Sequence, residues 1–297
     1  MTLGAAIPAG PELRYSCHIM RRVFLAVVLT CGWLVSGFSA QAPYRILLTN
    51  DDGVHAPGLE AMAEALRLLG EVTVVAPLEN QSGKGHALTL GSAIYRTDLT
   101  LLSGMAAVGL TATPVTTVKV ALDQIMIPPP DILVSGINRG YNLAMAAYVS
   151  GTVGAAREAA LQGVPAVASS RAYTASNDVG SYRAAAEMTA RIVAIVKARG
   201  IPKGVWLSVN VPEGTTATLR GLRLTTQGAE AGGTETFEMN RDADGRMAYR
   251  GRFVEGGTDV VEGSDTWAVS NGWVAVTPLR IGEFADGDLD TLAAIIK

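Results

Sequence analysis

Two adjacent carboxylates, Asp51 and Asp52, follow a short apolar run, RILLT (45–49), that predicts a buried strand. Neighbouring negative charges repel each other, and a bound cation would relieve that repulsion. Hard divalent cations take oxygen ligands such as carboxylates, hydroxyls and amide carbonyls. In the alternative interpretation, one aspartate caps the next helix and the other is solvated. The pair by itself leaves both possibilities open.

More polar residues follow the other predicted strands. Ser82 and Gly83 lie in a long loop after the second strand, and Asn138 and Asn142 follow the strand ILVS. Ligands of open α/β sheets bind beyond the carboxyl ends of the strands, so these residues are expected near the aspartates. The predicted ligands of one divalent cation are Asp51, Asp52, Ser82 and Asn138.

The tripeptide Ser150-Gly151-Thr152 opens an Ala-rich helix. Free N–H groups at a helix N-terminus attract anions, and glycine lets a phosphate approach closely. An ordinary N-cap by Ser150 or Thr152 is the simpler alternative. The predicted phosphate-binding residues are Ser82, Gly83, Asn142, Ser150, Gly151 and Thr152.

A cation and an anion site at one sheet edge together suggest phosphoryl chemistry. Our hypothesis is hydrolysis of a phosphate monoester by a water that the metal activates, with Asp51 and Asp52 as catalytic residues. Lys84 and His86, in the same loop as Ser82, are candidates for the acid that protonates the leaving group. A solvated loop histidine is the alternative for His86.

Strands and helices alternate along the chain, which predicts a doubly wound, mostly parallel, Rossmann-like α/β sheet. The turn signal Asp244-Gly245 predicts a β-hairpin extension within residues 220–270. The predicted strands are 45–49, 72–76, 132–135, 166–169, 206–211 and 273–277, and the predicted helices are 58–69, 113–125, 152–161 and 182–197.

Residues 1–42 have the pattern of a secretory leader. Arg21 and Arg22 precede thirteen uncharged residues, and small residues follow. Met20 is the predicted true start, and cleavage near Ala42 would leave residues 43–297 without cysteine. We therefore predict export, to the periplasm; a retained anchor and a cytoplasmic protein are the alternatives.

Composition excludes several classes of protein. Of the 297 residues, 48% are hydrophobic and 17% charged, which argues against a disordered chain. The formal net charge of −3 argues against a nucleic-acid duplex as partner. A dinucleotide-dependent oxidoreductase would need a G-x-G-x-x-G turn after the first strand, and NDDGVHAPG is not one.

The motifs at the predicted site also carry a family resemblance. RILLTNDDGVHAPGLEAMAEAL, VVAPLENQSG, DILVSGINRGYN and SGTVGAAREAALQGVPAVASS resemble, in this order, the motifs of the SurE family of metal-dependent 5′/3′-nucleotidases. LSVNVP and GWVAVTPL resemble later landmarks. The resemblance covers residues 44–280.

The resemblance implies hydrolysis of nucleoside 5′- and 3′-monophosphates with one divalent ion, most often Mg²⁺ or Mn²⁺. It implies that Asp51, Asp52, Ser82 and Asn138 bind the metal, and that Asn142, Ser150, Gly151 and Thr152 hold the phosphate. It further implies a homodimer or homotetramer that exchanges the C-terminal hairpin region.

The chain departs from the family pattern close to the site. Ala112 and Thr116 replace a glycine and an aspartate, Ala144 replaces a glycine, Val149 replaces a tyrosine, and Thr226 replaces a basic residue. These changes keep open a second hypothesis, an exported protein that binds phosphate or nucleotide without catalysis.

Overall fold

The computed structural model describes residues 42–229, 233–255 and 261–282. The chain divides after Ala42 into two units, and all the elements below belong to the second unit, residues 43–297. The predicted leader, with Met20 and both cysteines, lies outside the described residues, as does the extreme C-terminus. Within the described ranges, no helix combines the length and the apolar character that a membrane span requires.

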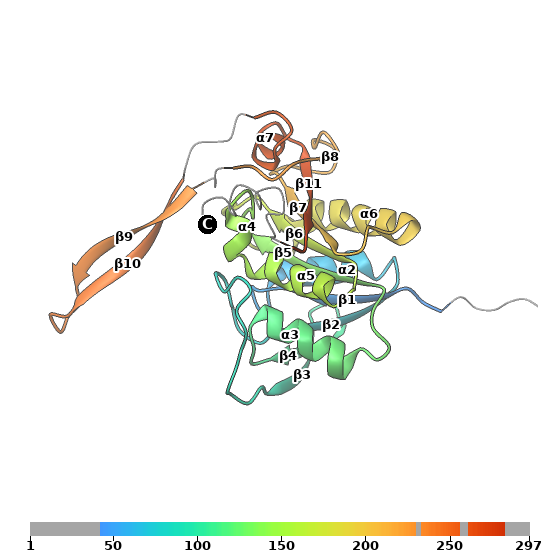
Figure 1. Cartoon of the computed structure of the whole chain (residues 1–297), viewed down its shortest axis with the longest axis horizontal. Helices are drawn as coiled ribbons and strands as arrows, with labels where there is room; N and C mark the ends of the chain where they lie inside the picture. Colours follow the sequence, from blue (N-terminus) through green and yellow to red (C-terminus); the bar gives the residue numbers. More distant parts are fainter. Residues whose placement is uncertain (1–41, 230–232, 256–260, 283–297) are drawn as a thin grey trace, which may run out of the picture. The chain divides into compact units, whose positions relative to one another are not determined.

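One mixed sheet of nine strands forms the centre of this unit (Figure 1). Its order is β3-β4-β2-β1-β5-β6-β7-β11-β8, and the strands from β4 to β7 are parallel to one another. Strands β3 and β11 run antiparallel to their neighbours β4 and β7. The bounds are β1 Arg45–Thr49, β2 Glu71–Pro77, β3 Arg96–Thr100, β4 Ala106–Leu110, β5 Ile132–Arg139, β6 Ala166–Arg171, β7 Val205–Val211, β8 Leu222–Leu224 and β11 Val274–Arg280. The predicted doubly wound, mostly parallel fold is confirmed.

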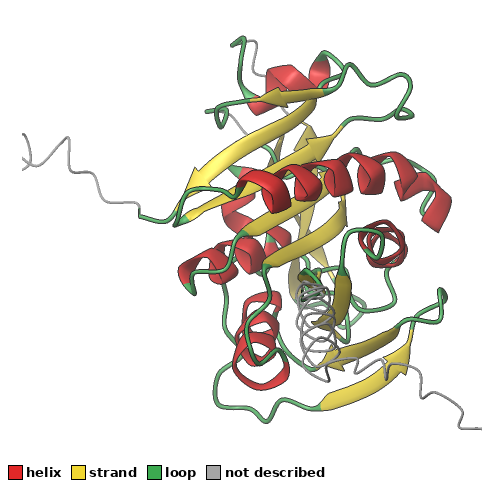
Figure 2. Ribbon diagram, turned by 90° about the vertical axis from the view of Figure 1, so that its right-hand side faces the viewer, coloured by secondary structure: helices red, strands yellow, loops and turns green. Residues whose placement is uncertain are grey.

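Helices cover both faces of the sheet (Figure 2). Alternate side chains of a strand point to opposite faces, so Ile46 and Leu48 join one buried cluster and Leu47 joins the other. The first cluster includes side chains of α2 and α6, and the second includes side chains of α3 and α5. The helix bounds are α2 Pro57–Leu66, α3 Pro114–Val120, α4 Ala146–Val149, α5 Gly151–Leu161, α6 Arg183–Arg199 and α7 Asp265–Ser270. A π-helical turn, Ala121–Ile125, extends α3, and a 3₁₀ turn, Val179–Tyr182, precedes α6.

Strands β3, β4 and β8 and two short helices were not predicted. Strands β3 and β4 form an antiparallel pair at one edge of the sheet, in a stretch for which no element was predicted. Strand β3 is mostly exposed, so it lacks the apolar alternation that marks a half-buried strand. Helices α4 and α7 have four and six residues, too few to show a helical period. Helix α2 ends at Leu66 rather than at residue 69.

The predicted hairpin is present as a separate two-stranded sheet. Strands β9 (Gly233–Arg241) and β10 (Met247–Glu255) pair antiparallel around a turn that contains Asp244 and Gly245. Gly245 has a φ of +78°, which explains glycine at this position. The two ends of the 220–270 segment are not part of the hairpin. Strand β8 pairs with β11 in the main sheet, and α7 packs against β11.

The strand order also locates the switch point of the sheet, where the order of the strands reverses. Strand β1 lies between β2 and β5. The chain therefore adds β2 and β4 on one side of β1, and β5, β6 and β7 on the other side. In doubly wound sheets, ligands bind at the carboxyl ends of the strands where the order reverses in this way. Asp51 and Asp52 follow β1, and Asn138 lies at the end of β5, so the predicted ligands lie at this point.

Candidate active site

Asp51 is buried between the end of β1 and the start of α5. Asp51 is only 3% exposed, and its Oδ1 accepts a hydrogen bond from the hydroxyl of Thr152. A Cβ added to Gly151 would lie 2.9 Å from Asp51 Oδ2. Only glycine fits here without displacing the carboxylate, so the backbone of the first turn of α5 reaches Asp51 directly.

Asp52 is less buried and has cationic neighbours. The backbone N–H of Arg139, the last residue of β5, donates to Asp52 Oδ2 at 3.3 Å. The hydroxyl of Ser82 lies close enough to this carboxylate to lower its pKa. The guanidinium groups of Arg139 and Arg171 add positive charge nearby.

These surroundings set the pKa values of the pair. Burial and, to a smaller extent, the charge of Asp52 raise the pKa of Asp51 to about 6, although hydrogen bonds from Thr152 act in the opposite direction. Burial also raises the pKa of Asp52, against the hydrogen bond and charge of Arg139 and the charge of Arg171. Neighbouring carboxyls whose pKa values are raised by burial are typical of functional sites.

The structure does not support the alternative in which one aspartate caps the next helix and the other is solvated. The N-cap of α2 is Ala56, and no side chain caps that helix. Neither aspartate serves as the helix cap, and Asp51 is shielded from solvent.

The loop between β2 and β3, residues 78–95, carries Ser82 and is called the Ser82 loop below. The N–H of Gln81 donates to the backbone carbonyl of Asp51 at 2.7 Å, which holds this part of the loop at the site. Asn80 Oδ1 accepts from the N–H of Ser82 at 2.9 Å and forms a local turn. Ser82 and Gly83 are exposed, so both can meet a ligand from solvent.

Asn138 reaches the site through an irregularity in β5. The register between β5 and β6 shifts between Ser135 and Asn138, as in a β-bulge, and the peptide bond between Gly136 and Ile137 is cis. A Cβ on Gly136 would lie 2.3 Å from the carbonyl oxygen of Ser169. Bulges redirect side chains next to active sites. The Asn138 amide donates to the Gly140 carbonyl at 2.9 Å, which leaves its Oδ1 as the atom suited to a cation.

Two predicted phosphate-binding residues make bonds within the protein. Ser150 Oγ accepts from the N–H of Val153 at 3.1 Å and caps α5, as the simpler interpretation expected. Asn142 Nδ2 donates to Ser170 Oγ at 2.8 Å. Thr152 is likewise bonded to Asp51, whereas Ser82 and Gly83 lie exposed at the tip of their loop.

The oxygen atoms at this edge suit a hard divalent cation. Thr49 Oγ1, Asn50 Oδ1 and Ser135 Oγ are buried and have no hydrogen-bond partner. Thr49 and Ser135 lie opposite each other in the β1–β5 ladder, beside the aspartate pair. Within the described part of the chain, no three His, Cys, Asp or Glu residues cluster as a metal site would require. Any cation here must complete its coordination with neutral oxygens, such as those of Ser82 and Asn138.

Two arginines near Asp52, Arg139 and Arg171, were not among the predicted site residues. Arg171 ends β6, is 4% exposed, and stacks 4.0 Å from the centroid of the Tyr182 ring. Its guanidinium donates to Thr174 Oγ1 at 2.6 Å and to the Ser176 carbonyl at 2.8 Å. The rule that located the aspartates, to inspect what ends each strand, would have found Arg171 at the end of β6.

The departures from the family pattern lie in supports of the site. Thr116 Oγ1 accepts from the N–H of Thr89 at 2.8 Å, at the far end of the Ser82 loop. Ala144 has a φ of +46°, which is unusual for a residue with a Cβ. The N–H of Ala144 donates to Asp265 Oδ2 at 3.0 Å, and Gln227 Nε2 donates to the carbonyl of Ala144 at 2.6 Å.

Ala144→Gly should therefore stabilise the protein. Glycine removes the steric cost of the left-handed conformation, and the greater freedom of the unfolded chain cancels part of the gain, which leaves about 1 kcal/mol. Urea unfolding would measure the change in the free energy of unfolding. Ala147→Gly, in the short helix α4, is the control and should destabilise by a similar amount. A destabilised Ala144→Gly variant would contradict this account of the turn.

The metal-free protein should lose stability between pH 4 and pH 7 because of Asp51. The native pKa, about 6, exceeds the ordinary value of 3.8, so protonation favours the folded state. This contribution is complete below pH 4 and disappears as the pH rises through 6. From two pKa units we expect a loss of about 3 kcal/mol. Unfolding in EDTA across this range should show a steeper loss in the wild type than in Asp51→Asn, where only Asp52 of the pair still titrates; equal slopes in both would refute the assignment.

Comparison with known proteins places the chain in a family. The model of the family "Survival protein SurE" matches residues 46–233. The "5′-nucleotidase SurE" of Geobacter sulfurreducens is 44% identical over 242 residues, which are 80% of this chain and 88% of that protein. That of Azorhizobium caulinodans is 36% identical over 258 residues, 85% of this chain and 99% of the relative. The crystal structure of the SurE protein from Aquifex aeolicus superimposes with a TM-score of 0.73 at 34% identity, over 85% of this chain and all of the other. The chain belongs to the SurE family.

Proposed function

We propose that this protein is a 5′-nucleotidase, a phosphomonoesterase that hydrolyses nucleoside monophosphates to nucleoside and phosphate. The observation that carries the proposal is the adjacent pair Asp51 and Asp52 at the switch point of the sheet, with Asp51 buried against the first turn of α5. The relatives named 5′-nucleotidase SurE support the same reaction class. Activity toward 3′-monophosphates is part of the proposal because the family resemblance implies it.

One divalent cation, Mg²⁺ or Mn²⁺, would be held by Asp51, Asp52, Ser82 and Asn138. When bound, such a cation polarises a phosphate ester and makes water more acidic. The unpartnered oxygens and the raised pKa values of both aspartates support a cation at this place. A cation binds the ionised form of the two carboxyls, so its binding would release any proton that they still hold.

The remaining groups position the substrate and move protons. The N–H groups at the start of α5 and the guanidinium of Arg139 attract the phosphate, and the exposed Ser82-Gly83 turn contacts it. Thr152 fixes the carboxylate of Asp51 through its hydrogen bond. Asp52 is less buried than Asp51, and it accepts the proton of the attacking water as general base.

Phosphate release is the direct test of this proposal. Residues 43–297 should release phosphate from nucleoside 5′-monophosphates in the presence of Mn²⁺ or Mg²⁺, and EDTA should abolish the release. Asp52→Asn removes a ligand and the base, so kcat should fall at least about a hundredfold. Glu64→Gln, on the exposed side of α2, is the matched control and should keep wild-type activity.

A folded protein that binds Mn²⁺ and releases no phosphate would refute the enzymatic proposal. The binding-protein hypothesis would then account for the site, and calorimetric binding of a nucleoside monophosphate without turnover would identify it. Parallel assays with 3′-monophosphates decide whether both positions are substrates.

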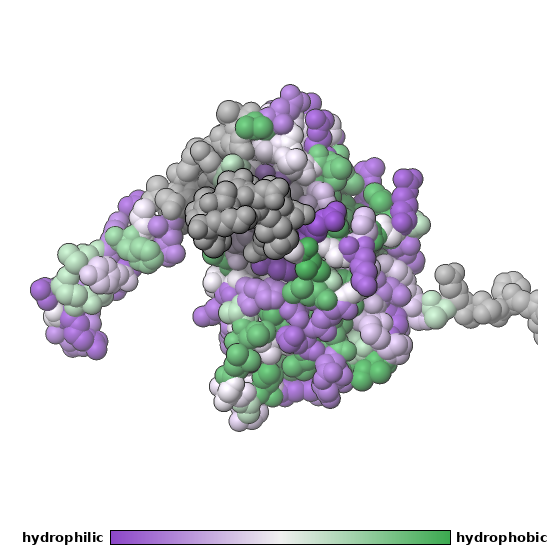
Figure 3. Space-filling model, viewed as in Figure 1, coloured by the Kyte–Doolittle hydropathy of each residue, from purple (hydrophilic) through white to green (hydrophobic). Residues whose placement is uncertain are grey.

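We further propose that the β9–β10 hairpin mediates assembly into a homodimer or homotetramer. Residues opposite each other in an antiparallel ladder share a face, so Phe237, Met239, Met247 and Tyr249 lie on one face of the hairpin. All four are exposed, between 44% and 68%, and Figure 3 shows hydrophobic residues on the surface of the hairpin. A two-stranded hairpin with an uncovered apolar face is marginal in water, and a second subunit would cover it.

Polar substitutions on this face should dissociate the assembly. Replacing Met239 and Tyr249 together by serine removes apolar area that the interface would bury, and the molar mass from light scattering should fall to that of one subunit. Arg250→Ala, on the opposite face of the same hairpin, should leave the mass unchanged. A wild-type protein that is already monomeric at micromolar concentration would refute the proposal.

A further inference from the structure

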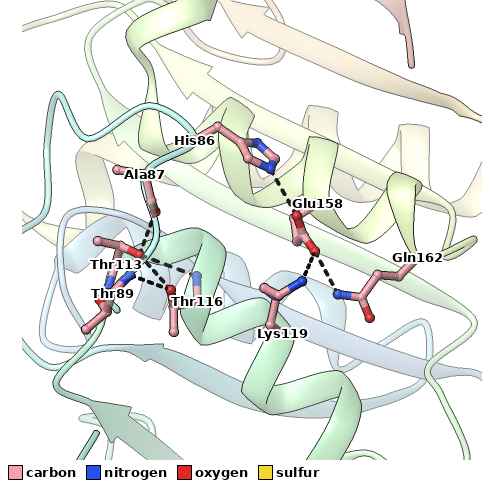
Figure 4. Close-up of polar contacts among 8 residues, drawn as sticks. All are labelled: His86, Ala87, Thr89, Thr113, Thr116, Lys119, Glu158 and Gln162. Carbon is pink, nitrogen blue, oxygen red and sulfur yellow. Dashed lines mark hydrogen bonds and ion pairs between the residues drawn. The ribbon is translucent and has the colours of Figure 1, made fainter. Parts of the chain in front are cut away.

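Another buried carboxylate, Glu158, lies on α5 seven residues after Gly151, about two helical turns from the aspartate pair. Its side chain is 6% exposed. It accepts hydrogen bonds from His86 Nε2 at 3.0 Å, Lys119 Nζ at 3.1 Å and Gln162 Nε2 at 2.8 Å (Figure 4). His86 lies in the Ser82 loop, Lys119 lies in α3, and Gln162 directly follows the last residue of α5. One carboxylate therefore joins three parts of the fold.

The charge on Glu158 is maintained by these donors. Burial alone would raise the pKa of Glu158, but the hydrogen bonds from Gln162, Lys119 and His86 and the charge of Lys119 together lower it. An ionised, buried acceptor makes stronger hydrogen bonds than a neutral one. The bond to His86 is thus a firm attachment for the loop.

The Ser82 loop is attached on both sides of Ser82. Before it, the N–H of Gln81 donates to the carbonyl of Asp51 at 2.7 Å. After it, the N–H of Gly85 donates to the carbonyl of Val149 at 2.9 Å. Residues 82–84 between these points are exposed. The position of Ser82 beside Asp52 consequently depends on how well the two attachments hold.

The attachment after Ser82 is a close contact of loop and helix. A Cβ on Gly154 would lie 2.2 Å from the carbonyl oxygen of Gly85, so the loop backbone rests on α5 where the helix has no side chain. His86, the next residue, supplies the side-chain bond to Glu158 one turn further along the helix. Its Nδ1 is buried without a partner, so the imidazole is held through Nε2.

The loop continues from His86 to α3. Thr113 Oγ1 donates to the carbonyl of Ala87 at 2.7 Å, and Thr89 Oγ1 accepts from the N–H of Thr113 at 2.9 Å. Figure 4 shows these bonds beside the Glu158 group. Lys119 of the same helix also bonds to Glu158, but it is half exposed and does not touch the loop near Ser82. Lys119 is therefore a suitable comparison for His86.

We infer that His86 and Glu158 are positioning residues, which hold the Ser82-Gly83 turn against Asp52 in the geometry that the reaction needs. The inference rests on the proposed function for its effect on catalysis, whereas its effect on the loop does not. Without the bond, the loop after Ser82 keeps its backbone contact with α5 but loses its side-chain attachment. Ser82 then samples positions away from Asp52, and misplacement of a reacting group by about 1 Å can cost up to a hundredfold in rate.

The test compares His86→Ala with Lys119→Met and His86→Gln. In His86→Ala we expect faster amide hydrogen exchange in residues 81–87, weaker Mn²⁺ binding by calorimetry, and a roughly tenfold loss of kcat/KM for a nucleoside 5′-monophosphate. Lys119→Met removes a bond to the same carboxylate from outside the loop. It should lower Tm to a similar extent and change the exchange and kcat/KM much less than His86→Ala does, because His86 and Gln162 still bond to Glu158. His86→Gln retains a donor of similar reach and should restore most of both properties.

The inference is overturned if His86→Ala loses thermal stability while its loop exchange, Mn²⁺ affinity and kcat/KM stay at wild-type values. It is equally overturned if Lys119→Met impairs all three as much as His86→Ala. A wild-type protein that hydrolyses no nucleotide would refute the proposed function instead. Hydrogen exchange and Mn²⁺ binding would still decide the role of His86 in that case.

Discussion

The proximity of two buried carboxylates is the constraint on which the surrounding structure depends. Placing Asp51 and Asp52 side by side at the end of a buried strand is unfavourable unless nearby groups supply donors or positive charge. The structure supplies hydrogen-bond donors and positive charge, and it does so differently for the two carboxylates. Asp51 receives the hydroxyl of Thr152 and the start of α5, whereas Asp52 receives the backbone of Arg139 and the charges of two arginines. This inequality separates the two carboxyls, so that one is held rigidly and the other is accessible.

Close approach of backbones makes this arrangement possible. Gly151 lets α5 begin against Asp51, Gly154 lets the Ser82 loop rest on the same helix, and Gly136 lets β5 bend beside β6. In each case an added Cβ would meet a neighbouring atom at less than 3 Å. Helix α5 thereby serves two purposes: its first turn faces the carboxylate pair, and its second and third turns anchor the loop that completes the site.

The departures from the family pattern have a common structural character. Thr116 bonds to the backbone of the Ser82 loop, and Ala144 is held by Asp265 and Gln227. Neither side chain contacts the aspartate pair through a hydrogen bond. The hydroxyl of Thr116 supplies an acceptor at the start of α3, which is the kind of bond that an aspartate there would also make. These positions act through the loops that carry the ligands, so their effect on the reaction is indirect.

The sequence by itself determined the layer order of the fold and the place of the site. Alternating apolar runs and helical periods are local, and the polar residues after β1, β2 and β5 had to meet at one edge because parallel strands end together. Only the tertiary structure decided which of these groups remain free. Ser150 caps its own helix and Asn142 bonds to Ser170, although each could equally have faced a phosphate. The partnership of His86 with Glu158 spans 72 residues, and the charge of Arg171 acts on Asp52 across the sheet. Such pairs follow from the packing of α5 against the Ser82 loop and of β6 against β5, which no local pattern in the chain encodes.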